Sequence, residues 1–214
     1  MKPSITDYYW QDEQAYGSLD YDDQPGRACF YALETKTARY SMQSVVLGSN
    51  NPKWATFFAA MIPDADIPSL QAVVVKSGDS KWIVRFAHYI STSNKTSLRK
   101  ALIKTKSASG AVQWLKHIDP SAANALKTII IKSGKPSDLL ELARHITAPK
   151  VIKQVEDLLV KGKAIRECRI FAQTISGANK KRLEKLILGS GNLKEIKALA
   201  KSKASIAAAL SVLF

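Results

Sequence analysis

The chain has 214 residues, 46% of them hydrophobic, which is enough to bury a sizeable core in one or two domains. Its 32 Lys and Arg residues against 18 Asp and Glu give a net charge of +14, which favours a polyanionic partner: nucleic acid, an anionic membrane surface or an acidic protein. The two cysteines, Cys29 and Cys168, lack CxxC spacing, which argues against a zinc site or a disulfide framework and favours a reducing, cytoplasmic environment.

Residues 1–41 form an acidic, aromatic-rich segment that we predict to cap the first repeat. Residues 1–26 hold six acidic residues and one basic residue, whereas the rest of the chain holds 31 basic and 12 acidic residues, a net charge of +19. The Tyr-Tyr-Trp run would pack on the repeat, or the acidic stretch would cover a basic surface as a competing polyanion. Phe30 stands 28 residues before Phe58, so residues 27–34 are predicted to be half of a degenerate repeat.

Six copies of a 28-residue pattern occupy residues 42–203, with one extra residue before the fifth copy. The copies begin at Met42, Leu70, Leu98, Leu126, Val155 and Leu183. A repeat of fixed length predicts a stack of supersecondary units, each in contact with its neighbours. The period is shorter than that of the 34-residue tetratricopeptide repeat or the HEAT repeat of roughly 40 residues, so neither name applies.

Each copy splits into two short helices joined by a tight corner. In the second copy, apolar residues recur at helical spacing over residues 68–76 and again over residues 79–90. Gly78, between them, is predicted to adopt the left-handed conformation that ends a helix, and Gly134 and Gly191 recur in this column. The next column supplies typical helix N-caps: Asn51, Asp79, Ser107 and Asn192. Helices of about ten residues are marginal alone, so we predict an all-α, right-handed α-solenoid of about six helix-turn-helix repeats.

Two further columns predict how the helices interlock. A large residue recurs in the second helix of every copy, at Phe58, Phe86, Trp114, Leu142, Phe171 and Leu199. A mostly small residue follows it, at Ala59, Ala87, Leu115, Ala143, Ala172 and Ala200. A large side chain beside a small one lets neighbouring helices approach closely.

The C-terminal residues 204–214 are apolar, and we predict a helix that covers the open end of the core. No apolar run of the chain approaches the roughly 20 residues that span a bilayer, so we expect no membrane partner.

The repeat resembles the short tandem helical-hairpin repeats of large DNA viruses and bacteriophages, whose functions are mostly unassigned. A Lys-Ser-Gly corner carries the resemblance in Lys76-Ser77-Gly78 and Lys132-Ser133-Gly134, and a Phe-Ala-His or Leu-Ala-Arg-His ending carries it at residues 86–88 and 142–145. The resemblance covers residues 42–203. It implies a helical-repeat fold and a viral protein of the host cytoplasm, but very little about function.

We find no motif of an active site and expect neither enzymatic activity nor a cofactor. The Lys-Ser-Gly corner lacks the GxxxxGK[ST] spacing of a phosphate-binding loop. His88, His117 and His145 have no HExxH motif or nearby Cys and Asp ligands, so we expect no metal site. Cys168 stands between Glu167 and Arg169 as a candidate nucleophile, but its column favours a packed thiol.

Two columns concentrate positive charge. One ends the first helices, at Lys76, Lys104, Lys132 and Lys161, and the other lies in the last turn of the second helices, at His88, Lys116, Arg144 and Lys201. Because the copies stack in register, each column predicts a row of charges about 10 Å apart. The helix dipole favours cations at these places by about 0.3–1 kcal/mol each, which explains their position but not their excess.

The charge rows lead to a first hypothesis, a non-enzymatic α-solenoid that binds nucleic acid through phosphate contacts. RNA, including ribosomal RNA, is preferred because a curved basic surface suits irregular shapes. The alternative is a protein–protein interaction scaffold, a viral protein that engages a host factor through Trp54 and Trp82, whose column we expect near solvent. A third hypothesis, an enzyme on nucleic acid such as a helical-repeat glycosylase, would need a carboxylate and aromatic pocket that no motif indicates.

Overall fold

The computed structural model describes residues 24–202, and every regular element in that range is a helix. The chain forms two compact units, residues 1–118 and 119–214, which we treat separately as the N-terminal and C-terminal units. The described helices of the N-terminal unit are α2 (Gln24–Glu34), η2 (Lys36–Ala38), α3 (Arg39–Gly48), α4 (Pro52–Met61), α5 (Ile67–Ser77), α6 (Ser80–Tyr89), α7 (Lys95–Thr105) and α8 (Ala108–His117). Those of the C-terminal unit are η3 (Pro120–Ala122), α9 (Ala123–Ser133), α10 (Pro136–Arg144), α11 (Pro149–Lys161), α12 (Ile165–Thr174), α13 (Lys180–Gly189) and a last helix described over residues 193–202.

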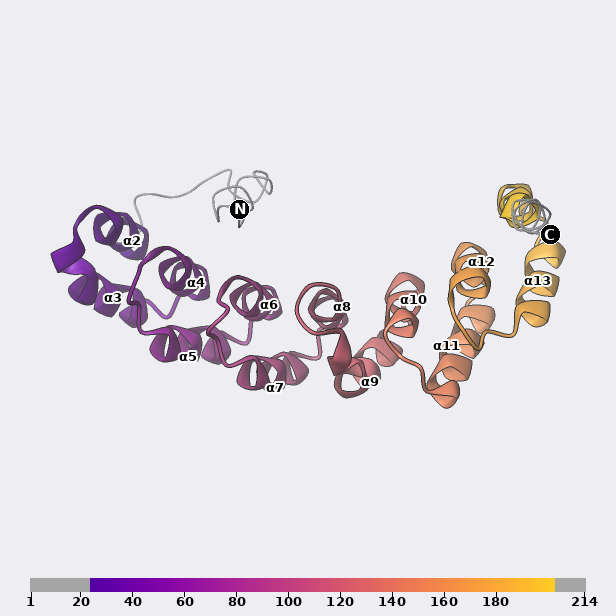
Figure 1. Cartoon of the computed structure of the whole chain (residues 1–214), viewed down its shortest axis with the longest axis horizontal. Helices are drawn as coiled ribbons and strands as arrows, with labels where there is room; N and C mark the ends of the chain where they lie inside the picture. Colours follow the sequence, from indigo (N-terminus) through magenta and orange to yellow (C-terminus); the bar gives the residue numbers. More distant parts are fainter. Residues whose placement is uncertain (1–23, 203–214) are drawn as a thin grey trace, which may run out of the picture. The chain divides into compact units, whose positions relative to one another are not determined.

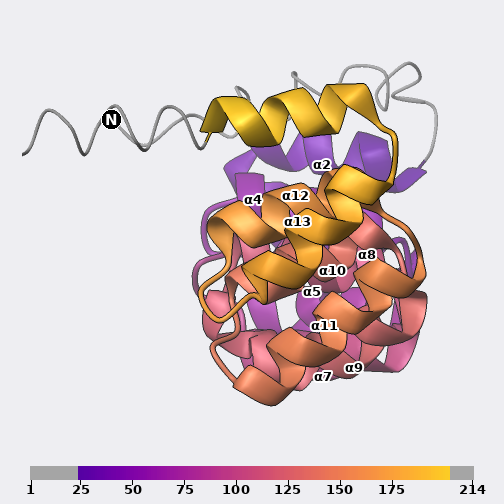
Figure 2. The same ribbon diagram turned by 90° about the vertical axis from the view of Figure 1, so that its right-hand side faces the viewer.

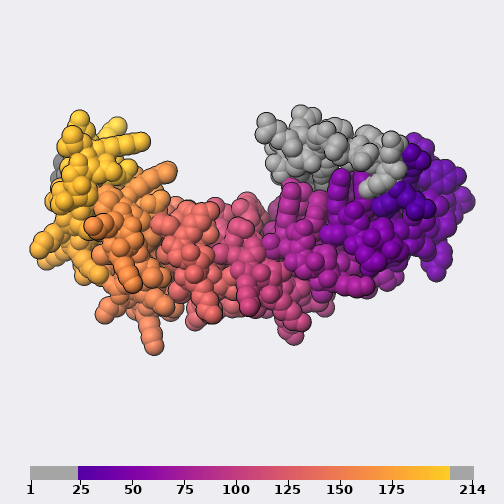
Figure 3. Space-filling model, turned by 180° about the vertical axis from the view of Figure 1, so that it is seen from behind, coloured from indigo at the N-terminus to yellow at the C-terminus, as the bar shows by residue number. Residues whose placement is uncertain are grey.

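Helices of each unit stack in two layers. In the N-terminal unit the first helices of the repeats, α3, α5 and α7, form one layer, and α2, α4, α6 and α8 form the second-helix layer (Figure 1). In the C-terminal unit α10 packs on α12, and α12 lies beside α13 (Figure 2). Within each unit the coloured bands of the space-filling view follow one another in sequence order (Figure 3). Each helix thus contacts its hairpin partner and its neighbours in the stack, which confirms the predicted all-α solenoid.

The core follows the predicted columns. All six large residues of the second helices, from Phe58 to Leu199, are buried. The small residues that follow them are buried too, except Ala200, which is exposed near the end of the described range. Burying a side chain as large as Phe86 stabilises the fold by about 1.5–3 kcal/mol, so this column is a main source of stability.

Every corner contains one left-handed residue, in the column that Gly78 predicted. The backbone φ angle lies between 50° and 70° at Asn50, Gly78, Lys106, Gly134, Lys163 and Gly191. The preceding Ser77 closes the corner: its hydroxyl donates to the Val74 carbonyl (2.7 Å) and accepts from the Asp79 N–H (3.2 Å). The same two bonds recur at Ser49, Thr105, Ser133 and Ser190. Lys-Ser-Gly is therefore a structural corner, as predicted.

The predicted N-caps of the second helices are confirmed. Asn51 and Asp79 accept from backbone N–H groups of the first turns of α4 and α6, and Ser107 does so for α8. Asn192 accepts from the N–H of Glu195 at 3.3 Å. At these four corners a satisfied cap beside a left-handed residue makes the corner tight without any contribution from distant residues, whereas Lys135 and Ala164 supply no side-chain cap at the other two.

In three of the copies, a second, unpredicted bond joins the repeat to the start of the next. The Gln71 side chain accepts from the backbone N–H of Asn94 (2.8 Å), the residue that caps α7. The same bond, 23 residues in span, joins Gln43 to Asp66 (2.9 Å) and Glu156 to Asn179 (2.8 Å).

Copies three and four carry cations instead, Arg99 and Lys127, which cannot accept a hydrogen bond. The first helices that follow them begin after Ala122 and Ala148, neither of which supplies a side-chain cap. The acceptor in one repeat and the N-cap in the next are therefore present together or absent together.

Helix α2 occupies the place of a second helix in the stack, because it packs on α3 and α4. This agrees with the predicted half repeat, but the predicted offset of 28 residues is wrong. Phe30 is only partly buried, whereas Ala28, Cys29 and Ala32 are buried. These three stand 30 residues before Phe58, Ala59 and Ile62, so two residues separate the predicted and observed registers.

The predicted acidic cap over residues 1–23 and the predicted C-terminal capping helix lie outside the described residues.

We expect Gln71→Ala to lower the free energy of unfolding by about 1–2 kcal/mol, because the buried amide is the acceptor for the Asn94 N–H. Equilibrium unfolding in urea measures this change. Lys127→Ala, at the same repeat position but without such a bond, is the matched control and should cost no more than about 0.5 kcal/mol. Equal losses in the two variants would contradict the role of the amide.

Candidate nucleic-acid interface

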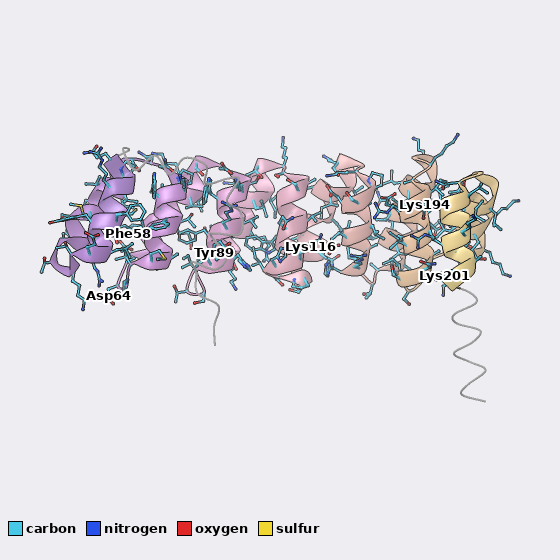
Figure 4. The ribbon with its side chains drawn as sticks, turned by 90° about the horizontal axis from the view of Figure 1, so that it is seen from above. Phe58, Asp64, Tyr89, Lys116, Lys194 and Lys201 are labelled. Atoms are coloured by element: carbon cyan, nitrogen blue, oxygen red, sulfur yellow. The ribbon has the colours of Figure 1, made fainter. Side chains whose placement is uncertain are left out.

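Each helical pair presents two edges. We call the edge where first helices end and second helices begin the corner edge, and the other, where the chain passes to the next repeat, the connector edge. A helix of ten residues separates them by about 15 Å. Lys194 and Lys201 show this separation, because they lie near opposite ends of the same helix (Figure 4).

The first predicted row of lysines lies on the corner edge. Lys76 and Lys104 end α5 and α7 in the N-terminal unit, and Lys132 and Lys161 end α9 and α11 in the C-terminal unit. All four are exposed, and none forms an ion pair with another residue of the described range. Lys76 makes one weak polar contact, from Nζ to Asn50 Oδ1 at 3.4 Å.

Two more corner-edge lysines were missed from the sequence. Lys106 and Lys163 occupy the left-handed position of their corners, with φ of 56° and 50°, and both are exposed. A lysine in this conformation is less stable than a glycine by about 1 kcal/mol, and three other copies have glycine there. The signal was in the alignment, because both lysines fall in the column of Gly78.

The second predicted row lies on the connector edge and is not continuous. His88 and Lys116 are exposed at the ends of α6 and α8. Arg144 donates to the buried Glu141 carboxylate at 3.0 Å, and Gln173 takes the same column in the fifth copy. This row therefore has fewer available charges than the corner edge.

Several carboxylates of residues 24–202 have structural roles in the fold. Asp66, Asp79 and Asp119 cap helices, and hydrogen bonds from Ser69 hold the pKa of Asp66 below its usual value. Glu156 and Glu195 are buried, and Arg169 Nε binds the Glu195 carboxylate at 2.6 Å. Asp79 lies exposed on the corner edge, because second helices begin there, whereas the buried Glu156 and Glu195 are held by partners inside the repeats and neutralise little of that edge.

The expectation that the Trp54 column lies near solvent is wrong. Trp54 is 1% exposed and packs its ring against Phe30 and Phe57, with centroids 6.4 and 5.7 Å away. Asp138 and Glu195 of the same column are also buried, and Trp82 is half-buried. The neighbouring second helix covers the column, which the repeat pattern alone did not reveal. The aromatic patch expected for a protein scaffold is thus not formed by Trp54.

Candidate catalytic groups do not come together. Among the described residues no cluster of three or more His, Cys, Asp or Glu side chains could hold a metal ion. The rings of His88 and His117 contact each other in the N-terminal unit. His145 belongs to the C-terminal unit, where its Nε2 lies 3.1 Å from the Glu141 carboxylate. Burial, with the nearby charges of Glu167 and Glu156, raises the pKa of the Cys168 thiol to about 11, so it stays a packed thiol at neutral pH.

Comparisons with known proteins add no family to this picture: no family model, no curated protein and no solved structure matches the chain. No described helix has the length and hydrophobicity needed to cross a membrane.

We expect Cys168 to resist a thiol reagent at pH 8 until the protein unfolds. The raised pKa of Cys168 also predicts how the free energy of unfolding depends on pH. Between about pH 9 and 11 the thiol ionises in the unfolded chain but not in the folded protein. Stability therefore falls as pH rises through this range. Urea unfolding across this range measures the slope. Cys168→Ala should show a shallower decline than the wild-type protein, and an identical decline would contradict the assignment.

Proposed function

We propose that this protein is a non-enzymatic α-helical repeat protein that binds nucleic acid, with RNA preferred, through phosphate contacts along its corner edge. One observation carries the proposal. Among the described residues, exposed lysines without ion pairs recur at equivalent ends of consecutive first helices, and the buried carboxylates of Glu156 and Glu195 are bound by arginines inside the repeats. Excess charge of this kind supplies most of the affinity in sequence-independent nucleic-acid binding.

Spacing supports phosphate contacts within each unit. Neighbouring helices pack about 8–10 Å apart, and each strand of a duplex carries one phosphate per about 3.4 Å of the duplex axis. A row of lysines parallel to that axis would then advance about three nucleotide steps from one first helix to the next. Lys106 and Lys163 add a second cation at alternate corners.

Low sequence specificity follows from the same geometry. Reading bases in a duplex requires a helix or a strand inside the major groove, whereas the corner edge offers helix ends and lysine side chains. Such a surface suits the phosphates of irregular RNA, of which ribosomal RNA is one example. Both cysteines are free thiols, which suits the reducing cytoplasm.

We expect the triple variant Lys76→Gln, Lys104→Gln, Lys106→Gly to bind labelled single-stranded RNA more weakly and to lower the slope of log affinity against log salt by about 2, from about 0.7 per lost contact. Fluorescence anisotropy over a salt series measures both. The control, Lys36→Gln, Lys95→Gln, Lys150→Gln, removes the same charge from exposed connector-edge lysines, in η2 before α3 and in the first turns of α7 and α11.

A loss confined to the corner-edge variant supports the proposal. Equal losses in both variants would show that only net charge matters, and no loss in either would overturn the proposal. A protein partner retained at high salt after nuclease treatment would favour the interaction scaffold instead.

A further inference from the structure

A groove of about 650 Å³ lies between α6 and α8 on the second-helix layer of the N-terminal unit. Helices α6 and α8 approach each other closely at both ends of the groove. At one end a Cβ atom on Gly110 would lie 3.1 Å from the Cβ of Ser80 and 2.9 Å from Leu102, so only glycine lets the two helix starts approach this closely. At the other end His88 Nδ1 lies 3.3 Å from the His117 carbonyl oxygen.

Side chains in the groove donate hydrogen bonds or carry positive charge. Lys81 and Arg85 line it together with the hydroxyl of Ser109 and the amide of Gln113, and no Asp or Glu of residues 24–202 is among its lining residues. The guanidinium of Arg85 lies 4.9 Å from the Trp82 ring centre, which restricts its motion before any ligand arrives. A planar guanidinium held in this way suits a phosphate or carboxylate group.

Apolar and aromatic groups complete the wall. Val84 and Tyr89 line the groove, and the Tyr89 ring contacts the His88 ring with centroids 4.9 Å apart. Aromatic rings and a planar guanidinium are the surfaces on which nucleobases stack. The volume falls within the usual 300–1,000 Å³ of small-ligand sites.

The residue that stands at this end of the groove differs between copies of the repeat. Gly110 stands in the column that holds Trp54 and Trp82 in earlier copies and Asp138, Glu167 and Glu195 in later ones. A bulky ring or a carboxylate at this column would fill the equivalent space or repel an anion.

We propose that this groove binds a nucleotide, with the phosphate at Lys81, Arg85 and Ser109 and the base toward Tyr89. The nucleotide is either free or the 5′-phosphorylated end of a single strand. This site goes beyond the corner-edge binding described above and does not depend on Lys76, Lys104 or Lys106.

The test is Ser109→Glu, which puts a carboxylate into the groove at the second residue of α8, where the helix dipole tolerates an acid. Ser137→Glu is the matched control, because Ser137 holds the same exposed position in α10. Binding of AMP is measured by calorimetry, and binding of a 5′-phosphorylated oligonucleotide by anisotropy, each at low salt.

We expect Ser109→Glu to weaken binding about tenfold or more while Ser137→Glu and the corner-edge triple variant keep AMP binding. Loss of AMP binding identifies a free nucleotide as ligand, and loss for the oligonucleotide alone identifies the strand end. If Ser109→Glu changes neither affinity, or if Ser137→Glu changes both equally, the groove is not the site.

Discussion

A single left-handed residue at each corner is the constraint on which the rest of the structure depends. Helices of about ten residues are too short to be stable alone, so the chain must fold back directly and pack each helix on its hairpin partner. The left-handed residue makes that fold-back locally, with help from a hydroxyl before it at five corners and from a side-chain N-cap after it at four. With the fold-back fixed, the large and small columns of successive second helices meet in register and form the core of each unit.

Corner geometry also decides where charge remains. First helices all end at the corner edge, where their dipoles favour lysine, and several of the described acids are buried inside the repeats. Glu156 illustrates this, because its carboxylate binds the Asn179 N–H and Arg182. The fold therefore holds much of its negative charge in place and leaves lysines exposed on the corner edge.

Local features could be predicted from the sequence, and features that depend on the next repeat could not. Gly78, Asn51 and the Phe86 column were recognisable because their signals lie within one copy. The burial of Trp54 and the bond from Gln71 to Asn94 depend on how consecutive repeats dock. The groove beside Gly110 likewise requires the distance between two helices, which no spacing in the sequence supplies.

Lysine at a left-handed corner is the observation that most directly supports the proposed binding role of the corner edge. The decisive measurement is the RNA affinity and unfolding free energy of Lys106→Gly and of Asn50→Lys, which adds a lysine at an equivalent corner. We predict that Lys106→Gly gains about 1 kcal/mol of stability and binds RNA more weakly, while Asn50→Lys loses stability and binds more tightly. Stability changes without any change in affinity would contradict the account.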